Sequence, residues 1–250
     1  MKNLRNLTIS SGISLLITAI CMILLGLTKS ESAVHRILLL LGGDVISGGY
    51  IQCITYIAFF WAFFEVREKL RVIKRERKAF KLNLIPTHEK HVFLPTDVNN
   101  LKFKLIEFEK KEKYILSDLL KKACTKYRAT GSLAELIEIV SIQVEVSQEK
   151  SEGDQSIIRY LTWVIPSVGF VGTVLGISQA LIVANSGDMD QIARLLGVAF
   201  DTTLVALVLS IIIMWFVHQL QEETDRFHSD LKEFVIDNLI NKIENYEEKA

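Results

Sequence analysis

Threonine side chains stand at matched positions in two apolar segments of the chain. Thr173 and Thr203 are equally far along the sequence from Asp188, which lies in the polar turn that joins the two segments. Two antiparallel helices connected there would hold both hydroxyls at nearly the same depth. Hydroxyls in hydrocarbon usually face a bundle interior or an aqueous path. The spacing therefore predicts part of a narrow hydrophilic ion path, to which we also assign Thr202.

The alternative for Thr173 alone is a local hydrogen bond. A single membrane threonine commonly donates its hydroxyl to the carbonyl four residues earlier, here that of Gly169. The second segment favours the path, because Ala199, Thr203, Ala206 and Ser210 recur at helical spacing and form one small, partly polar face.

Asp201 places an ionisable carboxyl in the same segment. It lies two positions from Thr203, so it points roughly the opposite way around the helix. An intramembrane Asp suggests function by default, and we include Asp201 among the ion-path candidates. A structural contact with a neighbouring subunit, or a link through water to Arg194, stays open as the alternative.

Small residues accompany these polar ones. Glycines on one side of the first segment would let another backbone approach closely: Gly169, Gly172 and Gly176. We assign Gly197 and Ala206 the same packing role on the second segment. Pro166 removes one backbone hydrogen bond, which predicts a kink in the first segment.

The composition alternates between apolar and charged blocks. Half of the 250 residues are hydrophobic, yet 29 Lys and Arg balance 29 Asp and Glu, which gives no argument for a nucleic-acid partner. Four blocks are long enough to be membrane spans, at about 7–27, 45–66, 157–184 and 192–217. The first is longer than the apolar region of a signal peptide and lacks a good cleavage site, so we expect it to be retained.

Basic residues set the expected orientation. A run rich in Arg and Lys follows Val66, which predicts a cytoplasmic side there and contact with anionic lipid headgroups rather than nucleic acid. We expect an all-α membrane protein with both termini in the cytoplasm. Its expected parts are a transmembrane hairpin (1–66), a cytoplasmic helical domain (67–156), a second transmembrane hairpin (157–218) and a cytoplasmic C-terminal helix (219–250). Residues 34–49, which are broken by glycines, are either interfacial or part of the second span.

Local patterns predict three elements in the polar regions. Helical spacing predicts a helix over 101–128, and the capping-box pattern from Ser132 to Glu135 starts another over 133–148. The tail carries an apolar stripe that we expect to pack as an amphipathic helix, with copies of itself as candidate partners: Leu220, Phe227, Leu231, Phe234, Leu239 and Ile243.

No enzyme or metal motif is found in the sequence. The three cysteines are expected to be unpaired thiols, and the five histidines, including His88 and His91 in a polar loop, have no zinc-ligand spacing. We therefore expect no catalytic residues and no cofactor. Two other function classes stay open: a membrane scaffold whose glycines only pack helices, and a solute transporter, which the lack of inverted repeats disfavours.

The motif Pro166-x-x-Gly169-x-x-Gly172-Thr173-Val174-x-Gly176-Ile177, with Thr203 in the following helix, resembles the MotA/TolQ/ExbB proton channel family. The resemblance implies an ion-conducting subunit of a bacterial inner-membrane motor or stator, driven by protons or sodium ions. It also implies a homopentamer around two single-span partners of the ExbD/TolR/MotB type, each contributing an essential Asp. Thr173 and Thr203 would line the ion path beside that Asp.

Two residues depart from the family pattern. The TolQ/ExbB branch has a Glu where this chain has Val198, and it lacks an acid at the position of Asp201. The extra N-terminal span resembles the four-span MotA branch, but the polar domain is short for a flagellar stator. The coupling ion stays open, as does the process powered: outer-membrane transport, envelope maintenance, motility or phage defence.

Overall fold

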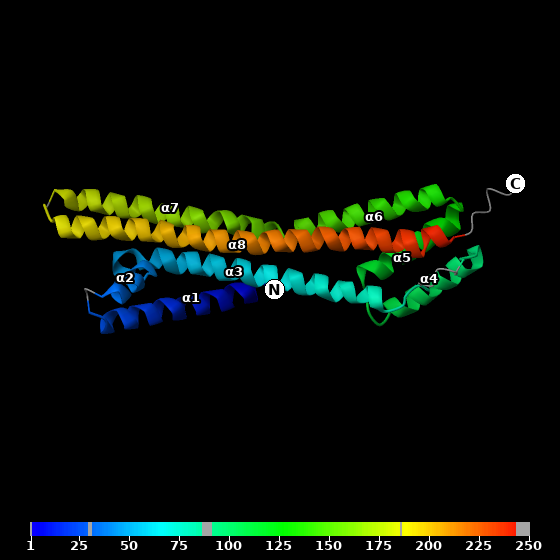
Figure 1. Ribbon diagram of the computed structural model, residues 1–250, viewed down its shortest axis with the longest axis horizontal. Helices are drawn as coiled ribbons and strands as arrows, with labels where there is room; N and C mark the ends of the chain where they lie inside the picture. Colours follow the sequence, from blue (N-terminus) through cyan, green and yellow to red (C-terminus); the bar gives the residue numbers. More distant parts are fainter. Residues whose placement is uncertain (1, 30–31, 87–91, 186, 244–250) are drawn as a thin grey trace. The chain divides into compact units, whose positions relative to one another are not determined.

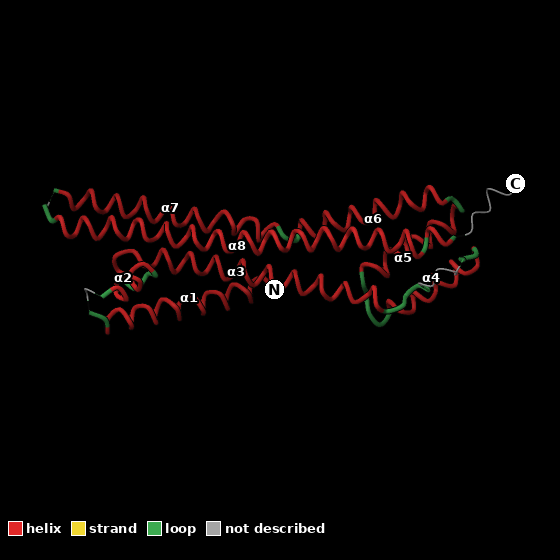
Figure 2. Tube along the Cα trace, viewed as in Figure 1, coloured by secondary structure: helices red, strands yellow, loops and turns green. Residues whose placement is uncertain are grey.

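The computed structural model describes residues 2–29, 32–86, 92–185 and 187–243, and this part of the chain is almost entirely helical (Figures 1 and 2). The one extended pairing within the described residues is an isolated bridge between Phe93 and Ile243. The expected all-helical class is therefore confirmed. The chain divides into two compact units, residues 1–68 with 156–219, and residues 69–155 with 220–250.

The first unit consists of two helix pairs and a short connecting segment. Its helices are α1 (Lys2–Leu27), α2 (Ala33–Leu40), the first part of α3 (Tyr50–Glu76), α7 (Ser156–Ala184) and the first part of α8 (Met189–Asn238). Figure 1 shows α7 running along α8. In the middle of α3, the buried Glu65 carboxylate accepts from the Asn6 amide at 3.1 Å, which ties α1 to α3.

Three helical segments among the described residues are long and apolar enough to cross a membrane: Leu4–Leu27, Leu133–Ala184 and Met189–Lys242. They contain the expected first, third and fourth spans. The expected second span (45–66) is not among them. Its helix, α3, carries polar and charged residues such as Gln52, Glu65 and Arg67, which lower its apolar character.

Residues 33–49 fold separately from α3, and we call them the cap segment. It consists of α2, whose first turn is capped by the Ser32 hydroxyl at 3.1 Å from the His35 N–H, and a π-helical turn at Val45–Gly49. Gly42 between them has a φ of +89°, a conformation that L side chains rarely adopt. The cap segment is therefore not a continuation of the α3 helix.

The second unit contains α4 (Pro95–Glu109), α5 (Ile115–Thr130), α6 (Leu133–Gly153), the remainder of α3 and α8, and short 3₁₀ turns at Arg77–Lys81 and Ile240–Lys242. The expected N-cap of α6 is confirmed, because the Ser132 hydroxyl accepts from the Glu135 N–H at 3.4 Å. The expected single helix over 101–128 is wrong: it is two helices. α5 starts afresh where the buried Glu76 carboxylate accepts from the Ile115 N–H at 2.8 Å.

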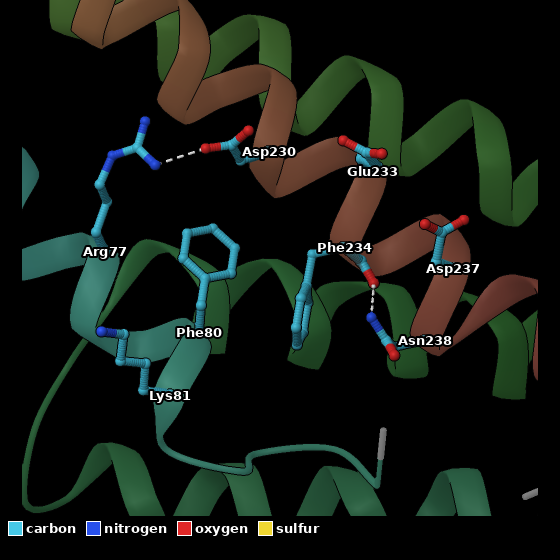
Figure 3. A pocket seen from close by; sticks show the side chains of 8 residues that line it. All are labelled: Arg77, Phe80, Lys81, Asp230, Glu233, Phe234, Asp237 and Asn238. Atoms are coloured by element: carbon cyan, nitrogen blue, oxygen red, sulfur yellow. Dashed lines mark hydrogen bonds and ion pairs between the residues drawn. The ribbon is translucent and has the colours of Figure 1, made fainter. Parts of the chain in front are cut away.

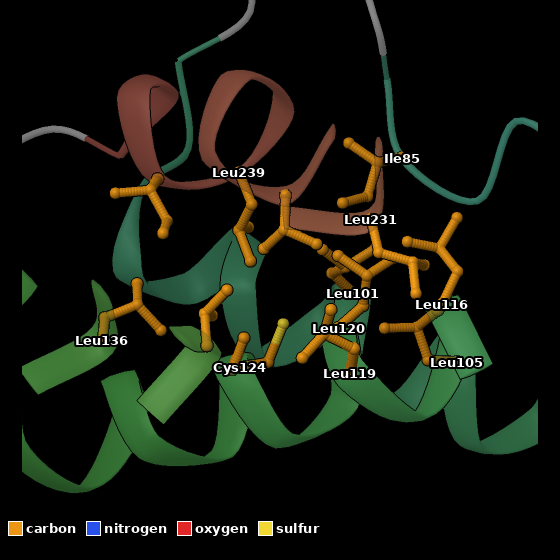
Figure 4. Packing of buried hydrophobic residues seen from close by; sticks show 14 of the residues in the cluster. Ile85, Leu101, Leu105, Leu116, Leu119, Leu120, Cys124, Leu136, Leu231 and Leu239 are labelled. Atoms are coloured by element: carbon orange, nitrogen blue, oxygen red, sulfur yellow. The ribbon is translucent and has the colours of Figure 1, made fainter. Parts of the chain in front are cut away.

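The core of the second unit is a cluster of leucine, isoleucine and aromatic side chains. Figure 4 shows its leucines together with Ile85 and Cys124. The tail stripe contributes to it, since Phe227, Leu231 and Leu239 are buried there. This stripe therefore packs within its own chain rather than requiring copies. Cys124 lies in the same core, and burial raises the pKa of its thiol to about 12, so it stays a neutral, unpaired side chain.

Candidate functional site

The helices α7 and α8 approach each other closely along the glycine side of α7. A Cβ added at Gly176 would lie 2.6 Å from the Cβ of Ala199 and 3.1 Å from its Cα, and one added at Gly172 would lie 2.5 Å from Oγ1 of Thr202. At Gly169 the obstructing atom is the Cβ of Ala206. No residue larger than glycine fits these positions at this separation.

The hydroxyls of Thr173 and Thr203 meet inside this helix contact. The two Oγ1 atoms are hydrogen-bonded to each other. Oγ1 of Thr173 also donates to the carbonyl of Ala199 at 3.0 Å, and Oγ1 of Thr203 donates to the carbonyl of Gly169 at 2.8 Å. The contact of Thr173 with the Gly169 carbonyl is the long one, at 3.5 Å, so the dominant bonds cross between helices.

The two threonine hydroxyls have fewer protons than the hydrogen-bond contacts that they make. Each threonine hydroxyl carries one proton, yet the pair makes three short contacts, one to each carbonyl and one to each other. At any moment one contact lacks a proton, and the cluster therefore keeps spare acceptor capacity. Both threonines are half-buried, so the cluster stays open to one side. Four oxygens gathered in this way can pass a proton or bind a small cation.

Thr202 is the third hydroxyl of the predicted path. It is buried, and its Oγ1 donates to the carbonyl of Ala199 at 2.7 Å, within its own helix. It also fills the space that Gly172 leaves. Thr202 thus shares the Ala199 carbonyl with Thr173 but packs against α7 instead of facing the open side.

Asp201 lies apart from the threonine pair, as its position on the helix predicts. Its carboxylate is buried and accepts both arms of the Arg36 guanidinium, with Nη2 at 2.7 Å from Oδ1 and Nη1 bonded to Oδ2. Both carboxylate oxygens are bonded to Arg36 of α2, whereas Arg194, the alternative partner through water, is exposed. Sequence reasoning missed Arg36 altogether.

A stripe of small polar residues on α1 was also missed. These residues recur at a spacing of four or three and are all buried: Asn6, Ser10, Ser14, Thr18 and Cys21. Ser10 and Thr18 donate to carbonyls one turn back. The regular spacing in an otherwise apolar segment is a signal that could have revealed a second helix contact built on small side chains.

Two predicted packing positions behave differently from the glycines of α7. A Cβ added at Gly197 would meet nothing within 4 Å in this chain, whereas Ala206 is fully buried against Gly169. Pro166 lies inside α7, which continues through it. The packing role therefore holds for Ala206 and is not visible for Gly197.

A groove of about 540 Å³ lies in the second unit (Figure 3). Arg77 and Asp230 face each other across it at 2.6 Å, and the rings of Phe80 and Phe234 pack edge to face with centroids 5.3 Å apart. Within the described ranges, no group of three or more His, Cys, Asp or Glu side chains could hold a metal ion. His88 and His91 lie outside the described residues.

The fold and the helix contact define a helical membrane protein in which two apolar helices enclose a polar cluster. Residues 111–233 match the model of the MotA/TolQ/ExbB proton channel family, so this region of the chain is similar to that family. The matched region contains Thr173, Thr203 and Asp201 but not Arg36. No curated protein and no solved structure matches the chain.

Proposed function

We propose that this chain is the ion-conducting subunit of an inner-membrane motor complex that converts an ion gradient into mechanical work. The observation that carries the proposal is the hydroxyl pair of Thr173 and Thr203, half-buried between α7 and α8 within the family's matched region. Gly and Ala already permit the close approach of the backbones, and the two hydroxyls add oxygen atoms and hydrogen bonds to the contact.

The oxygen cluster suits transfer of an ion to a second polypeptide. The two hydroxyls and the carbonyls of Gly169 and Ala199 provide acceptors at one level, and the spare acceptor capacity lets a proton move without leaving a buried oxygen unsatisfied. A sodium ion would use the same oxygens as ligands. The receiving group would be the essential Asp of a single-span ExbD/TolR/MotB-like partner, placed against the open side of the cluster.

The proposed assembly is a homopentamer around two such partners in the bacterial inner membrane. Four spans, with α3 as the second, would place both termini in the cytoplasm. The basic side chains that follow the apolar part of α3 support this orientation: Arg67, Lys69, Arg71, Lys74 and Arg75. The second unit would then be the cytoplasmic domain.

Removing the hydroxyls without changing side-chain volume tests the proposal. We expect Thr173→Val and Thr203→Val each to abolish partner-dependent ion flux into cells or vesicles while the complex still assembles. Thr162→Val is the matched control, because the Thr162 hydroxyl bonds only locally, to the Arg159 carbonyl at 2.7 Å, and its loss should leave flux unchanged.

Undiminished flux in both path variants would contradict the assignment and favour the scaffold function, in which the helix contact only holds the protein together. Flux should be measured in cells that also express the candidate partner and normalised to the amount of assembled complex. This normalisation separates loss of conduction from loss of protein.

A further inference from the structure

The cap segment (33–49) packs tightly onto three helices of the first unit. A Cβ added at Gly43 would lie 3.1 Å from the Cys21 carbonyl of α1, and one added at Gly48 would lie 2.8 Å from Val198 of α8. The Tyr56 hydroxyl of α3 donates to the Leu41 carbonyl at 3.0 Å. The cap segment is therefore closely packed against α1, α3 and α8, and its glycines permit the short distances.

The ion pair between Arg36 and Asp201 joins this segment to α8 through charge. The Asp201 side chain is 5% exposed and that of Arg36 58% exposed. A buried carboxylate without a partner is costly, and the bidentate guanidinium supplies charge and two donors in a fixed geometry. Both carboxylate oxygens are occupied by Arg36, so the group is held rather than free to carry an ion.

The ion pair of Arg36 with Asp201 also fixes the rotation of α8 about its own axis. Asp201 faces α2, while Thr203, two residues on, faces α7, so the same stretch of helix is held from two sides. Rotation of α8 that released Asp201 from Arg36 would also move the Thr203 hydroxyl away from Thr173. Charge on one side of the helix thus stabilises the hydroxyl contact on the other.

We propose that Arg36 is a positioning residue, which through Asp201 fastens the cap segment to α8 and keeps Thr203 aligned with Thr173. Asp201 is an anchor and not an ion carrier. The conduction part of this inference rests on the proposed function, whereas the fastening part does not. Arg36 lies outside the region that matches the family, whereas Asp201 lies within it.

A double-mutant cycle tests the fastening without any flux measurement. Arg36→Gln leaves a buried unpaired carboxylate, and Asp201→Asn leaves the guanidinium without a negatively charged partner and with one acceptor oxygen instead of two. We expect each to lower the thermal midpoint of the detergent-purified full chain, Arg36→Gln by on the order of 10 °C. The double variant Arg36→Gln/Asp201→Asn should recover most of that loss, and Arg36→Lys should recover part of it.

Arg194→Gln is the matched control, since Arg194 is exposed on α8, and it should leave the midpoint unchanged. Additive losses in the double variant, or no loss from Arg36→Gln, would overturn the fastening whether or not the chain conducts ions.

Flux per assembled complex, measured with the partner present, tests the positioning. We expect both single variants to reduce it and the double variant to restore it, because a neutral pair again holds α8. If Asp201→Asn and the double variant are both inactive while Arg36→Gln conducts, Asp201 carries the ion and the inference is wrong. Failure of the threonine variants to alter flux would instead count against the proposed function and leave the stability cycle intact.

Discussion

The glycine contact of α7 with α8 in the first unit and the core of the second unit are formed by different side chains. The first unit also buries large apolar side chains away from this contact, among them Leu161, Ile165 and Ile213. In the first unit, the contact of α7 with α8 uses Gly176, Ala199 and the threonine pair, and α1 presents a stripe of serine and threonine. In the second unit, the core is filled by residues such as Leu120, Leu136 and Leu231. One contact relies on closeness of backbones, and the other on burial of large apolar side chains.

A difference of this kind is expected between helices that pack in lipid and helices that pack in water. Lipid is as apolar as leucine, so burying leucine between membrane helices gains little, and close packing with hydrogen bonds must supply the attraction. In water, burying a Leu side chain contributes roughly 1.5–3 kcal/mol. The side chains of the α7–α8 contact are therefore of the kind found between membrane helices, in agreement with the three segments that are apolar enough to cross a membrane.

The largest expected effect comes from enlarging a residue at the close contact. In Gly176→Leu the new side chain would meet the Cα of Ala199 and the carbonyl of Leu195, at 3.1 and 3.2 Å from its Cβ, and backbone atoms cannot rotate away. We expect α7 and α8 to separate and the detergent-extracted protein to elute as aggregate in size-exclusion chromatography.

Gly26→Leu is the matched control for this change, because an added Cβ at Gly26 on α1 meets nothing within 4 Å. It should elute as the unmodified protein does. Normal elution of Gly176→Leu would mean that the first unit does not depend on the close approach of α7 and α8. It would contradict the difference drawn between this contact and the core of the second unit.

A smaller effect is expected from shortening a residue in the second unit. Leu120 is fully buried in that core, and Leu120→Ala should cost about 2–5 kcal/mol of unfolding free energy through lost burial and the cavity left behind. Leu82→Ala, at a 42% exposed leucine, should cost far less. Urea unfolding of the full chain, followed by circular dichroism, would measure both, and equal losses would contradict the assignment of Leu120 to the core.

Local patterns in the sequence predicted the features that depend on spacing along one helix or on two helices joined by a short turn. The Ser132 N-cap needs only its own first turn, and the meeting of Thr173 with Thr203 needs only a tight turn midway between them. The glycine side of α7 is likewise a property of one helix. Each of these is encoded by neighbouring or symmetrically placed residues.

Features that depend on distant partners were not predicted. Arg36 and Asp201 are 165 positions apart, and nothing near either residue indicates the other. The break between α4 and α5 has a similar cause, because the carboxylate that accepts from the first N–H of α5 belongs to Glu76, 39 positions earlier. The helical spacing of apolar residues continues through the break and therefore predicted a single helix. Nothing in that spacing indicates that the Glu76 carboxylate accepts from the N–H of Ile115.

The smallest expected effect concerns the stripe of small polar residues on α1, where two equally buried serines differ in hydrogen bonding. Oγ of Ser14 is buried and, among the described residues, has no hydrogen-bond partner, whereas Oγ of the equally buried Ser10 donates to the Asn6 carbonyl at 2.7 Å. A buried unsatisfied hydroxyl destabilises, so Ser14→Ala should keep the small size that the contact needs and raise stability by up to about 1 kcal/mol. Ser10→Ala should lower stability or leave it unchanged. Thermal midpoints in detergent would distinguish the two, and a clear loss from Ser14→Ala would contradict the assignment of its hydroxyl as unsatisfied.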